Sequence, residues 1–303
     1  MKRENTIQNG RRAVALGLFD GVHVGHRKVI GYTAELEKNG LIPTVFTFNN
    51  ETIGIKHNQM LEYIYSDAYK AELMKNLGIC EIYSSDFNTL KDMNGEEFAS
   101  EILVNRLNAG YVICGRDFHF GKNAVCGGKE LAELGRQYGF SVSITDDVQI
   151  CGKTVSSNAI RAHLKNGEVD VLPELLGDEY TVSGEVVYGN QIGRTLDFPT
   201  INQPYKKGQL VPKHGVYSSS VKIDGKSYKS VTNIGVKPTI EGERAPLAET
   251  HIIDYSGNLY GMTLDVKIKE FMRSEQKFSS FGALKSAVMA DIEYCKKTNL
   301  SKE

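Results

Sequence analysis

Short apolar runs alternate with helix-like segments through the first half of the chain. The run "AVALGL" (13–18) precedes a segment with helical spacing over 24–39, and the β-rich "PTVFTF" (43–48) follows it. The alternation continues to about residue 177, with runs short enough for strands and segments long enough for helices. Strands and helices in this rhythm form a parallel sheet covered by helices. We therefore expect an α/β domain over residues 1–177, with ligands at the carboxyl ends of its strands.

The pattern changes to strict apolar/polar alternation beyond residue 177. The alternating segments are rich in β-branched and aromatic residues: "YTVSGEVVYG" (180–189), "GVYSSSVKIDGKSYKSVTNIG" (215–235) and "AETHIIDYSGNLYGMTLDVKIKEF" (248–271). Asp224-Gly225 is a strong signal for a two-residue hairpin turn. The final segment, 279–297, begins with a serine N-cap and has apolar residues at helical spacing: Phe281, Leu284, Val288 and Ile292. We expect an antiparallel β-barrel over 178–303, with a closing helix packed through these four residues.

Composition and charge are those of a soluble globular protein. The 303 residues suffice for two domains, and 36 basic residues nearly cancel 37 acidic ones, which gives no support for nucleic-acid or membrane-surface binding. No apolar run is long enough for a membrane span or a signal peptide. Five scattered cysteines form no C-x-x-C pair. We expect a cytoplasmic protein with small-molecule partners, whose oligomeric state the sequence leaves open.

The stretch "GLFDGVHVGH" (17–26) lies on the first predicted strand-to-helix turn. Free backbone N–H groups and the helix dipole favour a phosphate there. His23 and His26 could both donate to phosphate oxygens and offset the charge that develops when an α-phosphate is attacked. The pattern favours adenylyl transfer, with a sharp turn carrying structural histidines as the alternative. Three glycines would let the backbone approach a ligand closely: Gly17, Gly21 and Gly25.

Further motifs follow this stretch in a fixed order. They are "GRDFHFG" (115–121), "VSSNAIRAHLKNGEV" (155–169), "GEVVYGNQIGRTLDFPTIN" (184–202), "VTNIGVKPTI" (231–240), "AETHIIDYSGNLYG" (248–261) and "EFMRSEQKF" (270–278). The ordered set resembles the bacterial bifunctional riboflavin kinase/FAD synthetases. The resemblance implies a Rossmann-like FMN adenylyltransferase domain over 1–177 and a riboflavin kinase barrel over 178–303. Together they would convert riboflavin to FMN and FMN to FAD, consuming ATP and releasing pyrophosphate in the second step.

In the first half, the resemblance implies roles for individual residues. His23 and His26 would bind ATP phosphates, and Ser157 with Arg161 would clamp them. Ser157 opens a predicted helix, where N–H groups and an arginine fork can hold a triphosphate. The flavin pocket would include Asp117 and Phe118. Further nucleotide contacts are expected at Gly17, Phe19, Asp20, Gly21 and Gly25.

In the second half, Thr200 and Asn202 are the predicted Mg²⁺ ligands. Their side-chain oxygens lie two residues apart in an extended segment, so they share one face and suit a hard cation bound to ATP. By resemblance, Glu249 is the general base that takes the proton from the 5′-hydroxyl of riboflavin. Arg273 matches a position near the flavin phosphate or the closing loop. A flap over the ATP phosphates is expected from Gly184, Gly193 and Arg194.

Three other functions remain open at this point. Asn158 and Ala159 differ from the residues usual in the family, so the chain could be a riboflavin kinase whose first domain binds without catalysis. A non-catalytic flavin sensor is a second possibility, although Glu249 argues against it because binding needs no general base. Nucleotidyl transfer to another phosphate acceptor is the third, and it would leave the kinase domain unexplained.

Overall fold

The computed structural model describes residues 10–53, 62–189, 198–238 and 244–297. The chain divides into two compact units, each described on its own below. The first contains Met1–Tyr63 and Asp67–Ser156, and the second contains Ile64–Ser66 and Ser157–Glu303.

The first unit is built on a five-stranded sheet in the order β3-β2-β1-β4-β5. All four strand pairs are parallel, which confirms the predicted α/β fold. The strand order reverses between β1 and β4, and such a switch point opens a crevice at the carboxyl ends of the two strands. The strands are β1 (Arg12–Leu16), β2 (Ile42–Phe48), β3 (Glu81–Ser85), β4 (Ala109–Gly115) and β5 (Ser141–Thr145).

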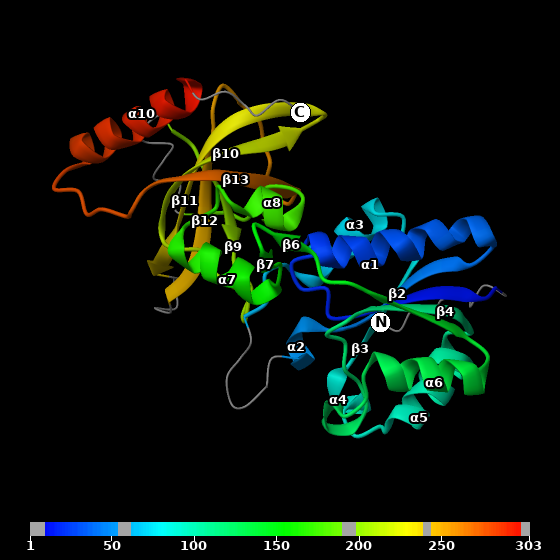
Figure 1. The fold of residues 1–303 in the computed structure, drawn as a ribbon. Coiled ribbons are helices and arrows are strands. Elements are labelled where there is room, and N and C mark those ends of the chain that lie inside the picture. The colour runs from blue at the N-terminus through cyan, green and yellow to red at the C-terminus, as the bar shows by residue number, and fades with distance from the viewer. Residues whose placement is uncertain (1–9, 54–61, 190–197, 239–243, 298–303) are drawn as a thin grey trace. The chain divides into compact units, whose positions relative to one another are not determined.

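Helices cover both faces of this sheet (Figure 1). Ala13 and Ala15 of β1 pack toward the helices of one face, whereas Val14 and Leu16 pack toward those of the other. The strand is therefore apolar on both sides, as buried parallel strands are. One face carries α1 (Val24–Glu35), its 3-10 continuation η1 (Leu36–Asn39) and α3 (Asp67–Asn76). The other carries α5 (Gly95–Glu97), η2 (Phe98–Arg106) and α6 (Gly128–Tyr138).

Residues 98–106 form a π-helix, η2, rather than an α-helix. Gly40 follows the first helical segment with a φ of 76°, the left-handed conformation common just after a helix end. The remaining elements of this unit are short. They are α2 (Asn50–Ile53), α4 (Phe87–Leu90), η3 (Lys122–Ala124), β6 (Gln149–Ile150) and β7 (Lys153–Thr154).

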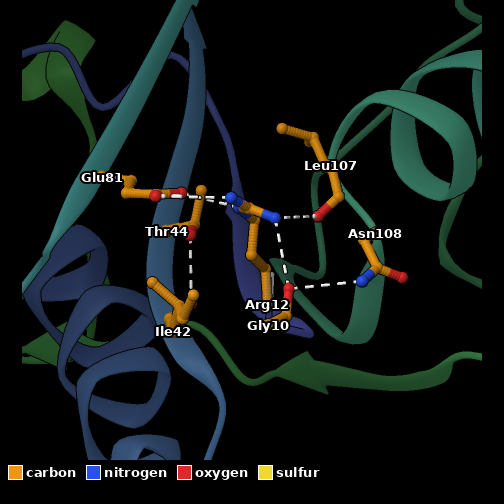
Figure 2. Close-up of polar contacts among 7 residues, drawn as sticks. All are labelled: Gly10, Arg12, Ile42, Thr44, Glu81, Leu107 and Asn108. Carbon is orange, nitrogen blue, oxygen red and sulfur yellow. Dashed lines mark hydrogen bonds and ion pairs between the residues drawn. The ribbon is translucent and has the colours of Figure 1, made fainter. Parts of the chain in front are cut away.

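A buried arginine joins the amino ends of β1 and β3 (Figure 2). Arg12 is fully buried, and its Nε donates to Glu81 Oε2 at 2.6 Å. Its Nη1 donates to the carbonyls of Leu107 (3.2 Å) and Gly10 (3.3 Å). The charge is thus paired and hydrogen-bonded, the condition under which a buried arginine is tolerated. This cluster lies at the edge of the sheet opposite the carboxyl ends of the strands.

The second unit is a six-stranded antiparallel sheet in the order β8-β13-β10-β11-β12-β9. Val187, just beyond β8, bridges to Asn202 of β9, so the two edges meet and the barrel nearly closes. Asp224 and Gly225 have φ angles of 48° and 80°, which confirms the predicted hairpin turn. The strands are β8 (Tyr180–Glu185), β9 (Ile201–Pro204), β10 (Gly215–Ile223), β11 (Lys226–Pro238), β12 (Arg244–Ile252) and β13 (Thr263–Arg273).

Two further helices, α7 (Ser157–Asn166) and α8 (Leu172–Leu176), group with the barrel. The backbone N–H of Lys213 donates to the carbonyl of Leu164 on α7 at 2.9 Å. Near the end of α7, Gly167 lies against the ring of Phe271 on β13. The segment after Ser156 therefore packs as part of the second unit.

The closing helix forms as predicted, but its contact surface differs. In α10 (Phe281–Lys297), Val288 and Ile292 pack with Val216 and Val231 of the barrel strands. The expectation that Phe281 also packs there is wrong, because this side chain is 70% exposed. The contact lies in the second half of the helix, whereas Phe281 and Gly282 at its start are exposed and Leu284 is half-buried.

Candidate active sites

Two of the sequence motifs lie side by side at the switch point of the first unit. Leu16, at the end of β1, is paired with Cys114 of β4. The stretches 17–26 and 115–121 therefore leave the sheet from neighbouring strands and at the same edge. This is the edge where open α/β sheets bind their ligands.

The turn after β1 has a strained backbone. Phe19 and Val22 have φ angles of 52° and 42° and are almost completely buried. A positive φ is costly for such residues, above all for β-branched valine, and this kind of strain is concentrated at functional sites. Gly21 has a φ of 80°. At Gly17, an added Cβ would lie 3.0 Å from the Phe19 ring, so both glycines are required by the path of the turn.

His23 and His26 form a stacked pair at the start of α1. Their ring centroids are 3.6 Å apart and the rings are inclined by 18°. His23 is the N-cap of the helix, and its Nδ1 accepts a hydrogen bond from the backbone N–H of His26 (3.3 Å). A neutral His23 therefore carries its proton on Nε2, the atom left to donate to a ligand. A Cβ on Gly25 would lie 3.1 Å from the His23 ring, so a larger residue would displace it.

Burial keeps both imidazoles neutral. Desolvation lowers the pKa of His23 to about 4. The pKa of His26 is well below its usual value, first because of burial and then because of the nearby His23 and Lys70. His26 Nδ1 is buried and has no hydrogen-bond partner within the described part of the chain. The pair can thus offer hydrogen bonds to a phosphate without carrying charge of its own.

The two predicted flavin contacts follow β4. Asp117 is exposed, and its carboxylate folds back over Gly115, where an added Cβ would lie 2.9 Å from Oδ1. Phe118 is half-buried and stacks on Phe120, with ring centroids 5.8 Å apart. Asp20, from the turn after β1, is buried.

Ser157 and Arg161 lie on α7, which begins at Ser157 as predicted. The Nη1 of Arg161 donates to Asn158 Oδ1 at 2.7 Å. Asn158, where the chain departs from the residue usual in the family, thus contacts the arginine predicted to bind phosphate. Both residues belong to the second unit by their packing.

In the second unit, the predicted kinase residues meet across the barrel wall. Asn202 of β9 is directly opposite Glu249 of β12, and Glu249 is directly opposite Asn233 of β11. Directly opposed residues of antiparallel strands share one face, so the three side chains form a row. Asn202 is buried and Glu249 is half-buried. Thr200 is half-buried and lies two residues before Asn202, just before β9 begins at Ile201.

Glycines leave room for the chain that passes over this row. A Cβ on Gly189 would lie 2.7 Å from Asn202 Nδ2, so only glycine permits the observed approach. The carbonyl of Gly184, on β8, accepts a hydrogen bond from Gln203 Nε2 at 2.9 Å. The other predicted flap residues, Gly193 and Arg194, lie outside the described residues.

The sequence interpretation missed Asn233 and Glu275 as members of this cluster. The Nδ2 of Asn233 lies 3.5 Å from Glu275 Oε1, and His214 Nδ1 lies 4.0 Å from Glu275 Oε2. The signal was present, because Asn233 stands in "VTNIGVKPTI" and Glu275 in "EFMRSEQKF". The strand register was needed to bring Asn233 opposite Glu249, and Glu275 joins the cluster through its contact with Asn233.

Arg273 and His251 make contacts that fix the barrel. The guanidinium of Arg273 forms a forked pair with Asp291 of α10, with Nη2 and Oδ2 2.7 Å apart. His251 Nδ1 lies 2.9 Å from the carbonyl oxygen of Pro199, which precedes the predicted metal ligands. His251 thereby ties β12 to the segment that leads into β9.

A sheet with an H-x-G-H turn at its switch point, together with a barrel that carries a glutamate beside an asparagine side chain, fits a two-domain transferase of phosphorus-containing groups. The family model for FAD synthetase matches residues 5–159, and that for riboflavin kinase matches residues 176–299. The chain belongs to the family of bifunctional riboflavin kinase/FMN adenylyltransferases.

Relatives with that printed name match nearly the whole chain. The protein from Pseudomonas fluorescens is 34% identical, over 91% of this chain and 89% of its own length. Those from Escherichia coli K12 and Bacillus subtilis are 33% and 30% identical, over 92% and 94% of this chain and 90% and 91% of their own lengths. The resemblance stated from the motifs is therefore confirmed.

A solved structure shares the fold from end to end. It is described as a macrolide-efflux protein from Streptococcus pneumoniae, is 28% identical, and aligns with a TM-score of 0.81 over 97% of each chain. Within the described residues of the present chain, no helix has the length and apolar character needed to cross a membrane.

Proposed function

We propose that the two units divide the two reactions of this family between them. The chain is a riboflavin kinase and FMN adenylyltransferase, which phosphorylates riboflavin to FMN and adenylylates FMN to FAD with release of pyrophosphate. The alternative of a kinase alone is not favoured, because the first half matches the FAD synthetase model and the relatives are bifunctional. The observation that carries the division is that each unit has its own polar site, at the sheet switch point and on the barrel wall.

In the kinase reaction, Glu249 is the general base. It accepts the proton of the riboflavin 5′-hydroxyl as that oxygen attacks the γ-phosphorus of ATP, and the bond to the bridging oxygen of ADP breaks. Glu249 lies directly opposite Asn202, which is a proposed ligand of the ATP-bound magnesium ion. This position supports the role, because it sets the base beside the proposed ATP site. Gly184, Gly193 and Arg194 are proposed to cover the phosphates, and Arg273 to lie near the flavin.

Thr200 and Asn202 fit a magnesium ion bound to ATP. Both offer neutral hard oxygens, two residues apart where the chain enters β9, and an added Cβ on Gly189 would lie 2.7 Å from the Asn202 amide nitrogen. Two protein ligands suit Mg²⁺, which keeps waters and takes its other ligands from phosphate. When bound, the ion would offset charge on the transferring phosphoryl group.

In the adenylyl transfer, a phosphate oxygen of FMN attacks the α-phosphorus of ATP and pyrophosphate leaves. His23 donates a hydrogen bond from Nε2, and the His26 imidazole donates a second one. The neutral pair thereby stabilises the negative charge on the phosphate oxygens. We assign nucleotide binding also to Ser157 and Arg161, and flavin contacts to Asp117 and Phe118. Backbone contacts with the nucleotide are proposed at Gly17, Phe19, Asp20, Gly21 and Gly25.

We further propose that the activities divide at residues 177 and 178, although 157–177 packs with the barrel. The near balance of 36 basic and 37 acidic residues supports small-molecule partners rather than nucleic acid. The cytoplasm, where riboflavin and ATP are both available, is the proposed compartment.

The test supplies the purified protein with riboflavin, ATP and Mg²⁺, and in a second reaction with FMN in place of riboflavin. Flavins are separated by chromatography. FAD in both reactions is the expected result. FMN that accumulates from riboflavin, with no FAD in either reaction, would contradict the proposed role of the first unit.

A further inference from the structure

A lysine without an assigned role lies buried next to the histidine pair. Lys70, on α3, is only 3% exposed, whereas lysine side chains are rarely buried unless they are paired. In sequence it stands in "SDAYKAELMKNLG", where it looks like one more charged residue of an amphipathic helix. Its hydrogen bond to the Leu18 carbonyl places it against the turn that carries the histidines.

The ammonium group is held by oxygens from three segments. Lys70 Nζ forms an ion pair with Asp67 Oδ1 at 3.2 Å and donates to Asn50 Oδ1 at 3.2 Å. It also donates to the backbone carbonyl of Leu18 at 3.5 Å, and Thr47 Oγ1 donates to the same carbonyl at 3.1 Å. Leu18 is the residue before the strained Phe19, so this contact fixes the beginning of the turn that carries the histidines.

We infer that Lys70 is a positioning residue for adenylyl transfer: its buried ammonium holds the Leu18 carbonyl and sets a fixed positive charge beside the His23–His26 pair. The inference rests on the proposed function of that turn. Its chemical consequence is that a lysine held by the protein supplies positive charge at the turn, whereas the histidines act as neutral donors.

The charges that act on the His26 imidazole support this inference. They come from His23 on the same turn and from Lys70 on α3, and both lower the pKa of His26 in addition to the effect of burial. Asp67 forms an ion pair with the Lys70 ammonium. Removing the ammonium takes away one of the charges that oppose protonation, so His26 would become easier to protonate.

The experiment compares Lys70→Met, Lys70→Arg and the exposed control Lys75→Met from the same helix. With FMN as substrate, Lys70→Met should lower kcat/KM for FAD formation about tenfold or more. The acidic limb of its pH profile should move to higher pH. Lys70→Arg should restore most of the activity, because it keeps the charge, and Lys75→Met should behave as the wild type. Conversion of riboflavin to FMN should be unchanged in every variant.

A second readout follows the imidazole of His26 directly by nitrogen NMR during a pH titration. In Lys70→Met, His26 should become protonated at a higher pH than in the wild type. Unchanged titration of His26, or loss of activity by the same factor at every pH, would overturn the inference and leave Lys70 a structural residue.

If Lys70→Met does not fold, Lys70→Gln provides the test, because its amide can still donate to the Leu18 carbonyl but carries no charge. His26 should then become protonated at a higher pH than in the wild type, and an unchanged titration point would overturn the inference. Absence of FAD formation by the wild type would instead overturn the proposed function, while the NMR comparison would still decide the role of Lys70.

Discussion

At the scale of single residues, the first site depends on groups that are buried and uncharged. His23 combines two tasks, because its Nδ1 caps α1 while its Nε2 remains available to a phosphate. The neutral form is enforced by burial, which lowers its pKa to about 4. Neutral imidazole as a hydrogen-bond donor avoids placing two adjacent charges in a stacked pair, and the buried Lys70 supplies the positive charge instead.

This protonation state predicts how stability depends on pH. Below a pH of about 6.5 the unfolded chain protonates His23, but the folded chain does so only near 4, so stability falls as the pH drops through this window. When the pH falls from 7 to 5, protonation of His23 in the unfolded chain lowers the free energy of unfolding by about 2 kcal/mol. His23→Asn keeps an N-cap side chain and removes the titration.

Urea unfolding of the wild type and His23→Asn at both pH values measures this effect, with a probe of the first unit. The variant should lose about 2 kcal/mol less than the wild type on acidification. The account of a buried neutral His23 fails if the two proteins lose stability equally.

At the scale of elements, the sequence pattern predicted the strands and the hairpin well, because their periodicity is local. The parallel sheet, the turn at Asp224 and the start of α7 at Ser157 all follow it. Long-range contacts explain the differences. Phe281 has helical spacing but extends past the part of α10 that contacts the barrel.

The sequence pattern also did not predict which polar residues are buried. Four hydroxyl side chains bond to one another across the barrel strands, which satisfies them without water; they are Ser219, Ser230, Thr232 and Thr250. The same limit applies to the sites. The motifs predicted which turns carry the chemistry. Lys70 reaches the first site through tertiary packing, and Asn233 reaches the second through the strand register, so neither role could be predicted from the sequence pattern.

We expect the forked ion pair between Arg273 and Asp291 to stabilise the closing helix, α10. Asp291 is nearly buried, so Asp291→Asn leaves the Arg273 charge without its partner. We expect the local opening free energy of α10 to fall by about 2 kcal/mol. Hydrogen exchange followed by mass spectrometry should show faster exchange over residues 281–297.

The matched control is Glu293→Gln on the same helix. The Glu293 carboxylate pairs with Lys296, three residues further along α10, at 3.7 Å, and both side chains are exposed. An exposed pair of this kind contributes little, so exchange should match the wild type. Equal exchange in Asp291→Asn and the wild type would show that apolar packing alone holds α10.

At the scale of the whole molecule, the chain combines two folds that each supply one phosphate chemistry. The α/β unit offers a strained turn at the switch point of a parallel sheet, and the barrel offers a row of side chains across β9, β12 and β11. FMN is the product of the second unit and the substrate of the first. The central claim is that each reaction has its own site.

The most direct measurement of that claim follows both conversions in Glu249→Gln and His26→Asn, with flavins separated by chromatography. The account predicts that Glu249→Gln loses FMN formation from riboflavin by about 10²-fold or more and still converts FMN to FAD. It predicts the reverse loss for His26→Asn. If either variant, still folded by circular dichroism, lost both conversions together, the division of the two reactions between two sites would be contradicted.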